Sequence, residues 1–279
     1  MNWLVDFIAS FSLFGSQYTA GWLAAAALAL AGVLVVAERK IFLGAAAAQS
    51  SILGCAIAMV LADSLQLADE HWARSELFAT ALAVGFAVLA AIVVSQGRDD
   101  SMQRDVRTAA VFLGSASLAI LVVSKSPHGL EEVHRIVASS LLGSTWADAG
   151  VFAVLLVLGI TAAARWWRPL LLIAMDPPMA RAVGLKVRCT KWLVAIYTGV
   201  AVGSAIRCAG LLYAFGMLVL PPLIAAQCAR RTSILFWLAP TIALGLAVPS
   251  FVIAHGLDLP PGQMAVAVLC AALVVMRRW

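Results

Sequence analysis

The chain alternates between long apolar segments and short polar breaks, a pattern that predicts a bundle of membrane-spanning helices. A helix needs about 20 apolar residues to cross the hydrocarbon core of a bilayer. Nine segments come near this length, and residues 3–14 add an amphipathic or interfacial stretch. The nine predicted spans are 19–37, 41–62, 76–96, 108–124, 147–164, 191–206, 209–228, 233–254 and 261–276. We therefore expect an all-α polytopic protein in which residues 1–279 form a single transmembrane domain.

One polar break carries helix signals of its own. Residues 175–191 read MDPPMARAVGLKVRCTK and lie between two apolar segments. Asp176 offers an N-cap oxygen, and Pro177 fits the first turn of a helix. Gly184 supplies a stop signal a few residues later. The pattern predicts a short, basic, exposed helix at about 175–185, which is typical of a docking element.

Composition supports the membrane assignment. The chain is 63% hydrophobic and 12% charged, with a mean hydropathy of +0.98, whereas soluble domains carry about 25% charged residues. The five cysteines show no paired spacing, so we expect neither disulfides nor a cysteine metal site. The net charge of +5 comes from basic residues at the ends of apolar segments, so we expect no nucleic-acid partner.

The Lys and Arg residues also predict an orientation. Nine spans place the two termini on opposite sides of the membrane. With a cytoplasmic C-terminus, 15 of the 19 basic residues lie inside, and only Arg74, Lys125, Arg135 and Arg207 lie outside. Because cytoplasmic loops are enriched in Lys and Arg, we expect the N-terminus outside and the segment 175–191 in the cytoplasm.

Some isolated residues stand out in or near the predicted spans. Pro221 and Pro222 lie together inside an apolar segment, and each proline frees a backbone carbonyl. The pair indicates either a broken helix that lines a translocation path or a packing kink. Asp148, near a helix start, is interpreted as a cap. Arg207 is either functional or a residue of the external boundary.

Together these motifs make the chain resemble a known family, the ABC-3 permeases of zinc, manganese and iron ABC importers. The resemblance covers nearly the whole chain, and the last 105 residues follow the family in order and spacing. The residues that carry it are ERKIFLG at 38–44, LLGS at 141–144, MDPPMARAVGL at 175–185, GLLYAFGMLVLPPLIAAQCARR at 210–231 and GLDLPPG at 256–262.

The resemblance implies a type II ABC importer-like permease in the plasma membrane, the inner membrane of a bacterium. It implies partners as well: a second permease copy or related subunit, a cytoplasmic ABC ATPase and an extracytoplasmic solute-binding protein. ATP hydrolysis is expected on the ATPase, since this chain has no GxxxxGK[ST] loop. We therefore expect a transport subunit rather than an enzyme, with no covalently bound cofactor and a divalent metal as cargo. The residues expected to couple it to the ATPase are Asp176, Pro177, Ala180, Arg181 and Gly184.

The sequence departs from the family in its second predicted span. The family pattern is Gly-Asp-x-x-x-His, in which Asp and His share a helix face and can hold a divalent cation. Here Gly44 and Gly54 match, but Ala45 occupies the Asp position and Gln49 the His position. The usual intramembrane metal site is therefore absent or altered. We expect Ala45, Gln49, Pro221 and Pro222 to lie on the translocation path.

An external segment offers a different candidate metal site. On a helix, His128 would face Glu131 and Glu132, and Glu131 would face His134. Two imidazoles and one or two carboxylates suit zinc, manganese or iron. The alternative interpretation is an ordinary solvated helix.

Three other functions stay open at the level of sequence. The same scaffold could move a chelated metal or another small solute, since the Asp and His ligands are missing. A non-transporting membrane sensor or assembly partner would not need an ATPase-docking helix. A secondary transporter would usually carry buried carboxylates, and the predicted spans contain almost none.

Overall fold

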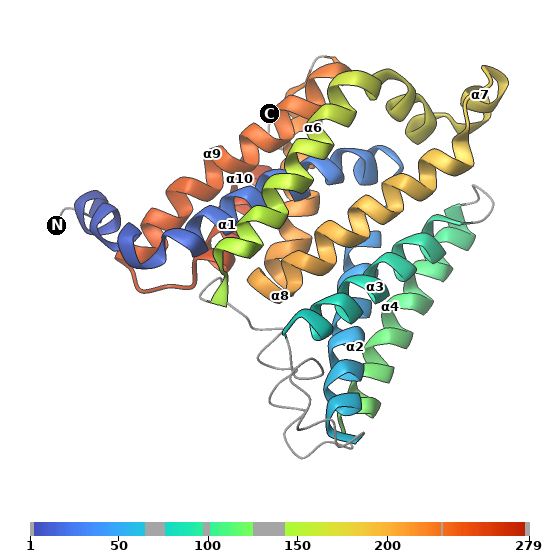
Figure 1. Ribbon diagram of the computed structural model, residues 1–279. Helices are drawn as coiled ribbons and strands as arrows, with labels where there is room; N and C mark the ends of the chain where they lie inside the picture. Colours follow the sequence, from blue (N-terminus) through green and yellow to red (C-terminus); the bar gives the residue numbers. More distant parts are fainter. Residues whose placement is uncertain (1–2, 65–75, 97–100, 125–142, 230, 277–279) are drawn as a thin grey trace.

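The computed structural model describes residues 3–64, 76–96, 101–124, 143–229 and 231–276. All of the regular structure within these ranges is helical (Figure 1). The elements are α1 (Trp3–Ala37), α2 (Leu43–Ser64), α3 (Glu76–Ser95), α4 (Ser101–Val123), α6 (Trp146–Met175), α7 (Pro177–Ala182), α8 (Val187–Cys228), η3 (Thr232–Ile234), α9 (Leu235–Gly256) and α10 (Pro261–Met276).

Among the described residues, seven helices are long and apolar enough to cross a membrane. One of them, α8, has 42 residues and would be about 63 Å long if straight, roughly twice the hydrocarbon thickness. It bends at Gly210, whose φ of 81° and ψ of 171° are not helical. Its two arms correspond to the predicted spans 191–206 and 209–228. When both arms and the shorter α10 are counted, the described helices provide about nine crossings, as the sequence predicts.

Two predicted segments continue further than the hydropathy pattern indicates. The stretch 3–14, expected as a separate interfacial segment, belongs to the continuous helix α1. Helix α6 continues past the predicted end at residue 164 to Met175, across a kink at Trp166 with φ −131°. Pro169 follows the kink and cannot donate a hydrogen bond to the carbonyl of Arg165. Polar and proline residues interrupt the apolar pattern at both places without ending the helix.

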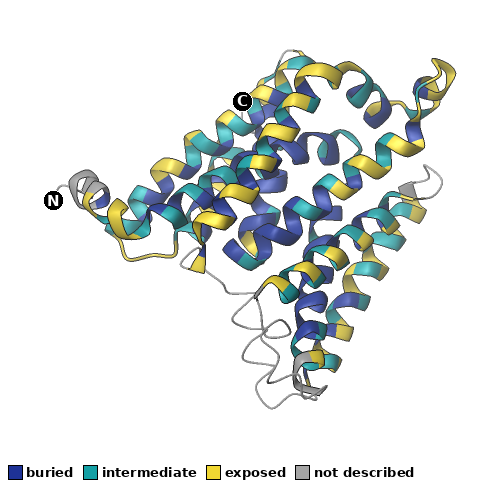
Figure 2. Ribbon diagram, in the orientation of Figure 1, coloured by how far each residue is buried: buried dark blue, intermediate teal, exposed yellow. Residues whose placement is uncertain are grey.

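The helices pack as two groups around α8. Helix α1 packs against α6, α8 and α9, while α2 packs against α3, α4 and α8. Figure 1 shows the first arm of α8 running from α7 toward the start of α6, with α2, α3 and α4 gathered beside it. Figure 2 shows the dark blue of buried residues concentrated in α1, α2 and α8.

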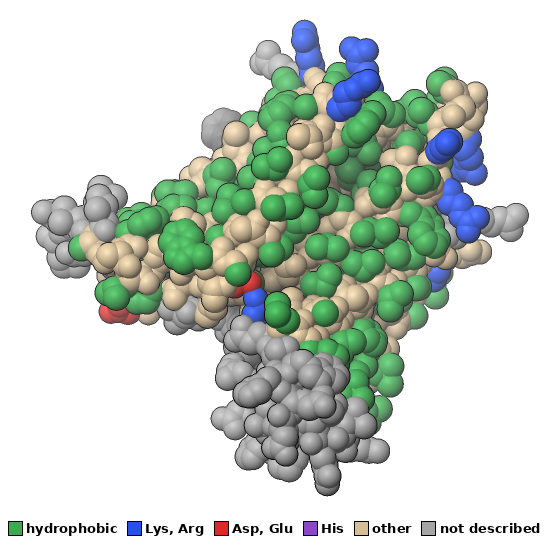
Figure 3. All heavy atoms as spheres, in the orientation of Figure 1, with side chains coloured by type: hydrophobic (Ala, Val, Ile, Leu, Met, Phe, Trp, Pro, Cys, Tyr) green, Lys and Arg blue, Asp and Glu red, His purple; other side chains and the backbone are tan. Residues whose placement is uncertain are grey.

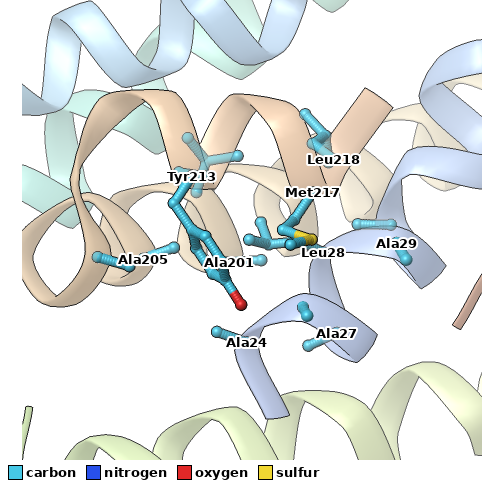
Figure 4. Packing of buried hydrophobic residues seen from close by; sticks show 14 of the residues in the cluster. Ala24, Ala27, Leu28, Ala29, Ala201, Ala205, Tyr213, Met217 and Leu218 are labelled. Carbon is cyan, nitrogen blue, oxygen red and sulfur yellow. The ribbon is translucent and has the colours of Figure 1, made fainter. Parts of the chain in front are cut away.

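Alanine is the commonest buried side chain among the described residues. Ala24, Ala27 and Leu28 of α1 are at most 1% exposed. They share one core with both arms of α8, and Figure 4 shows Ala201 and Tyr213, one from each arm, among them. Small side chains let membrane helices approach closely. Closely approaching helix backbones therefore make up much of the core, and large side chains such as Tyr213 fill the spaces between them.

Candidate functional site

Helix α7 projects from the end of the molecule at which α6 stops and α8 starts (Figure 1). The Asp176 side chain caps it by accepting a hydrogen bond from the Met179 N–H at 3.0 Å. The backbone N–H of Leu185 donates to the Ala180 carbonyl at 3.0 Å, across Gly184 with a φ of 84°. This arrangement closes the C-terminus with a left-handed glycine. The cap, the short helix and the glycine stop are present as predicted.

Helix α7 has one buried face and one exposed face. Ala180 is fully buried in a small cluster with Ile173 of α6 and Val187 of α8. Met179 and Val183 are 52% and 60% exposed, and Arg181 is exposed beside them. The buried alanine ties α7 to the helices on either side, which leaves an apolar and basic face directed away from the bundle.

The predicted path residues on α2 share one helix face. Ala45 and Gln49 are both half-buried, whereas Ala46, Ala47 and Ala48 between them are fully buried. Since residues four apart in a helix face the same way, Ala45 and Gln49 present one methyl group and one amide to the same space. An amide oxygen is a neutral and weak ligand for a divalent cation, and a methyl group is no ligand.

Both prolines of α8 are buried, and Pro222 lies against α1. Pro222 has no N–H to donate to the carbonyl of Leu218, four residues earlier. This carbonyl points at Gly32 of α1, where an added Cβ would lie only 1.7 Å from the oxygen and 2.9 Å from the Pro222 ring. The freed carbonyl is therefore covered by the α1 backbone, and Pro222 takes part in the packing of α1 on α8.

A polar cluster joins three elements at the opposite end from α7. Thr145 caps α6 in a capping box with Asp148, whose carboxylate also pairs with Arg207 of α8. The Ser144 hydroxyl donates to the carbonyl of Cys208, and the Ser16 hydroxyl of α1 donates to the carbonyl of Ser144, each at 3.3 Å. Asp148, predicted as the cap, takes part in it as the third residue of the helix, whereas the N-cap residue itself is Thr145. The pairing of Asp148 with Arg207 is not predicted above, although opposite charges within apolar segments indicate that two such residues can pair.

The external candidate metal site lies outside the described residues. His128, Glu131, Glu132 and His134 all fall in the segment 125–142. Within the part of the chain that the structure describes, no three His, Cys, Asp or Glu side chains group as metal ligands would. The predicted site at 128–134 therefore stays a prediction.

Several apolar helices of membrane-spanning length, with a short capped helix at one end, define a multi-span membrane protein. Residues 11–278 match the ABC 3 transport family, and the chain belongs to that family. The match spans almost the whole sequence, as the resemblance of its motifs implied.

Relatives and solved structures agree with this assignment. The chain is 24% identical over 278 residues to a Thermotoga maritima protein named as a metal transport system membrane protein, covering 98% of this chain and 92% of the relative. It is 26% identical over 233 residues to the manganese transport system membrane protein MntB of Synechocystis, covering 81% of this chain and 72% of the relative.

The fold is similar to that of PsaBC from Streptococcus pneumoniae, solved with a Fab, with a TM-score of 0.79, 16% identity and coverage of 98% of this chain and 95% of the other. A transporter described as of the metal-chelate type, in an inward-facing conformation, has a TM-score of 0.76 at 16% identity, with coverage of 98% and 90%.

Proposed function

We propose that this chain is the permease subunit of an ATP-driven importer that moves a divalent transition metal, namely zinc, manganese or iron. Two copies, or this chain and a related subunit, would enclose the path and expose it alternately to the two sides of the inner membrane. A cytoplasmic ABC ATPase would supply the energy, and an extracytoplasmic solute-binding protein would deliver the ion. The relatives named for manganese and metal transport support the substrate class.

The observation that carries the proposal is the construction of α7. A short helix that is capped at both ends and tied to α6 and α8 through Ala180 can pass a displacement to the bundle as a rigid unit. Met179 and Val183 supply the apolar contact area, and Arg181 supplies the charge, for a partner on the same side. Asp176, Pro177 and Gly184 fix the ends of the helix and therefore its direction.

Reconstitution tests the proposal. The chain would be incorporated into vesicles with its ATPase and binding protein, and uptake of radioactive Mn²⁺, Zn²⁺ and Fe²⁺ would be measured together with ATP hydrolysis. We expect one of these ions to stimulate hydrolysis and to accumulate only when ATP is present. Accumulation without ATP would indicate a secondary transporter, and no response to any of the ions would remove the substrate assignment.

A matched pair of variants tests the docking surface. Met179→Asp places a charge on the exposed apolar face of α7, and we expect it to lower co-purification of the ATPase. Leu259→Asp makes the same change at a side chain that is 47% exposed between α9 and α10, and should leave co-purification unchanged. Equal retention of the ATPase by both variants would contradict docking through α7.

A second candidate function keeps the scaffold and changes the cargo. Ala45 and Gln49 cannot replace an aspartate and a histidine as ligands for a bare cation. A metal that arrives already chelated, or another small solute, needs no such ligands, and one solved structure of similar fold is described as of the metal-chelate type. Uptake of chelated metal in the absence of uptake of free metal ions would select this alternative.

A further inference from the structure

A polar cavity of about 360 Å³ lies beside α7, where four parts of the chain meet. The turn between α1 and α2, the first turn of α4, the junction of α6 with α7 and the first arm of α8 form its walls. Its charged lining consists of Glu38, Arg39, Lys40, Arg104 and Lys191. The lining therefore carries four cations and one carboxylate, drawn from three separate elements.

Specific contacts fix the positions of the side chains that line the cavity. The Lys40 ammonium pairs with the Glu38 carboxylate at 2.5 Å, and these side chains are only 7% and 11% exposed. Arg104 donates to the Glu38 carbonyl at 3.1 Å, and the Lys40 N–H donates to the Val35 carbonyl at 2.9 Å. Glu38 is paired with Lys40, and three further cations, Arg39, Arg104 and Lys191, line the same cavity.

Exposed apolar side chains adjoin the basic groups on the same elements. Phe42, just after the α1–α2 turn, is 69% exposed, and Met102 and Val106 of α4 are 71% and 58% exposed. Met175, which lines the cavity, is 63% exposed. Figure 3 shows Lys and Arg side chains gathered at the edge of the molecule, next to faces covered by hydrophobic side chains. A phosphate or an acidic protein side chain would engage the cations alone, whereas a phospholipid would engage the cations and also place its acyl chains on these apolar side chains.

We propose that this cavity binds the phosphate headgroup of an anionic phospholipid of the cytoplasmic leaflet, with the acyl chains lying along Phe42 and α4. Basic pockets between helices on the cytoplasmic side are known to take such headgroups. Pro177, the first residue of α7, lies in the cavity wall, so the bound lipid touches the base of the coupling helix. The proposal rests on the orientation and the membrane function proposed above.

Lipid binding to the purified chain tests the proposal. Native mass spectrometry would follow titration with dioctanoyl phosphatidylglycerol and, separately, with dioctanoyl phosphatidylcholine. We expect the anionic lipid to bind at least about tenfold more tightly, because each Lys or Arg near the headgroup strengthens binding about fivefold. For the same reason, the double variant Arg39→Gln with Lys191→Gln should weaken phosphatidylglycerol binding about 25-fold.

Two matched double variants separate the cavity from general surface charge. Arg39→Lys with Lys191→Arg keeps the charge and should keep the affinity. Arg165→Gln with Arg231→Gln removes two cations outside the cavity and should change the affinity about twofold at most. The melting temperature and gel-filtration profile of each variant would show that it is folded.

Three results would overturn the proposal: equal binding of the two lipids, unchanged binding by the Arg39 and Lys191 variant, or displacement of the lipid by an equal concentration of inorganic phosphate. The last would identify a site for a free anion. The lipid-binding assay contains neither ATPase nor metal, so its result does not depend on transport. A protein that binds the lipid but transports no metal would refute the proposed function and leave the lipid site standing.

Discussion

The contact between Gly32 and the Leu218 carbonyl explains how a proline pair is accommodated inside an apolar helix. Pro222 leaves that carbonyl without its helical donor, and an unsatisfied carbonyl is costly in a membrane. Gly32 allows the backbone of α1 to cover it, because a Cβ at this position would overlap the carbonyl oxygen. A side chain at residue 32 would separate the two helices at this point.

This contact predicts a large effect of a single methyl group. In Gly32→Ala the new Cβ would overlap the Leu218 carbonyl, and we expect a loss of about 1–3 kcal/mol of stability through overpacking. The control is Gly85→Ala on α3, where an added Cβ meets nothing within 4 Å and should stabilise the helix by about 0.5–1 kcal/mol. Thermal unfolding in detergent would compare the variants, and a Gly32→Ala protein as stable as the wild type would refute the contact.

The shared face of Ala45 and Gln49 predicts a gain of function. The double variant Ala45→Asp with Gln49→His supplies one carboxylate and one imidazole four residues apart, and we expect it to bind Mn²⁺ or Zn²⁺ more tightly than the wild type does. Isothermal titration of the purified protein would measure the affinity. Gln49→His alone is the control, since it adds a single ligand, and no gain by the double variant would show that the two positions do not share a site.

For single residues, the sequence predicts which residues cap or end a helix more reliably than it predicts which distant residues they contact. The cap that includes Asp148 and the glycine stop at Gly184 depend on a few adjacent residues, and both are found, although Thr145 is the N-cap residue. The pairing of Asp148 with Arg207 and the contact of Gly32 with Leu218 join residues far apart in the chain. Local patterns do not contain that information.

Among the elements, α7 is followed closely by α8, so a displacement of α7 can be transmitted along α8. The first arm of α8 starts just after α7 and leads to the kink at Gly210, beside the cluster formed by Asp148 and Arg207. Gly199 and Gly203 on this arm let the α3 backbone approach closely, since an added Cβ would lie 2.6 Å and 2.9 Å from the Cα atoms of Val88 and Val84. A movement of α7 would therefore reach α3 and the far side of the bundle.

Weakening the contact of α7 with α6 and α8 should uncouple ATP hydrolysis from transport. Ala180→Glu buries a charge in the cluster with Ile173 and Val187, and we expect ATP hydrolysis to continue while uptake falls sharply. That cluster is separate from the main core, so the bundle should stay folded. Ala180→Ser, which adds only a hydroxyl group, should retain coupling. The ratio of ions transported to ATP hydrolysed is the measurement, and an unchanged ratio in Ala180→Glu would exclude α7 as the coupling element.

The existence of the long helices could be predicted from hydropathy, but where they join could not. Each predicted span corresponds to helical sequence because 16–22 apolar residues have no other stable state in a bilayer. Residues 3–14 and 19–37 join in the single helix α1, and α6 continues to Met175. Both continuations depend on contacts that the intervening polar residues make with other parts of the chain. Ser16, for example, donates its hydroxyl to the carbonyl of Ser144, a residue far away in the sequence, at 3.3 Å.

For the whole molecule, the basic residues predict an orientation that can be measured. Cys189 and Cys228 are exposed at the two ends of α8, on the side assigned to the cytoplasm. We expect a membrane-impermeant maleimide to label them only in inverted vesicles. Leu259→Cys, at the loop between α9 and α10, should add labelling in spheroplasts. The opposite pattern of labelling would reverse the predicted topology.

The alanine core has a consequence for how such a bundle changes shape. An alanine side chain has no rotamer to lose or exchange, so where alanines line a contact one helix can slide along another with little reorientation of side chains. Larger side chains would interlock the helices and resist small shifts. In this molecule the resistance to sliding comes from large buried side chains such as Tyr213, and from contacts such as the pair of Asp148 with Arg207 and the approach of Gly32 to Leu218. The energy barrier between its conformations should therefore be set at those points, and a few substitutions there should change the rate of interconversion more than many substitutions elsewhere in the core.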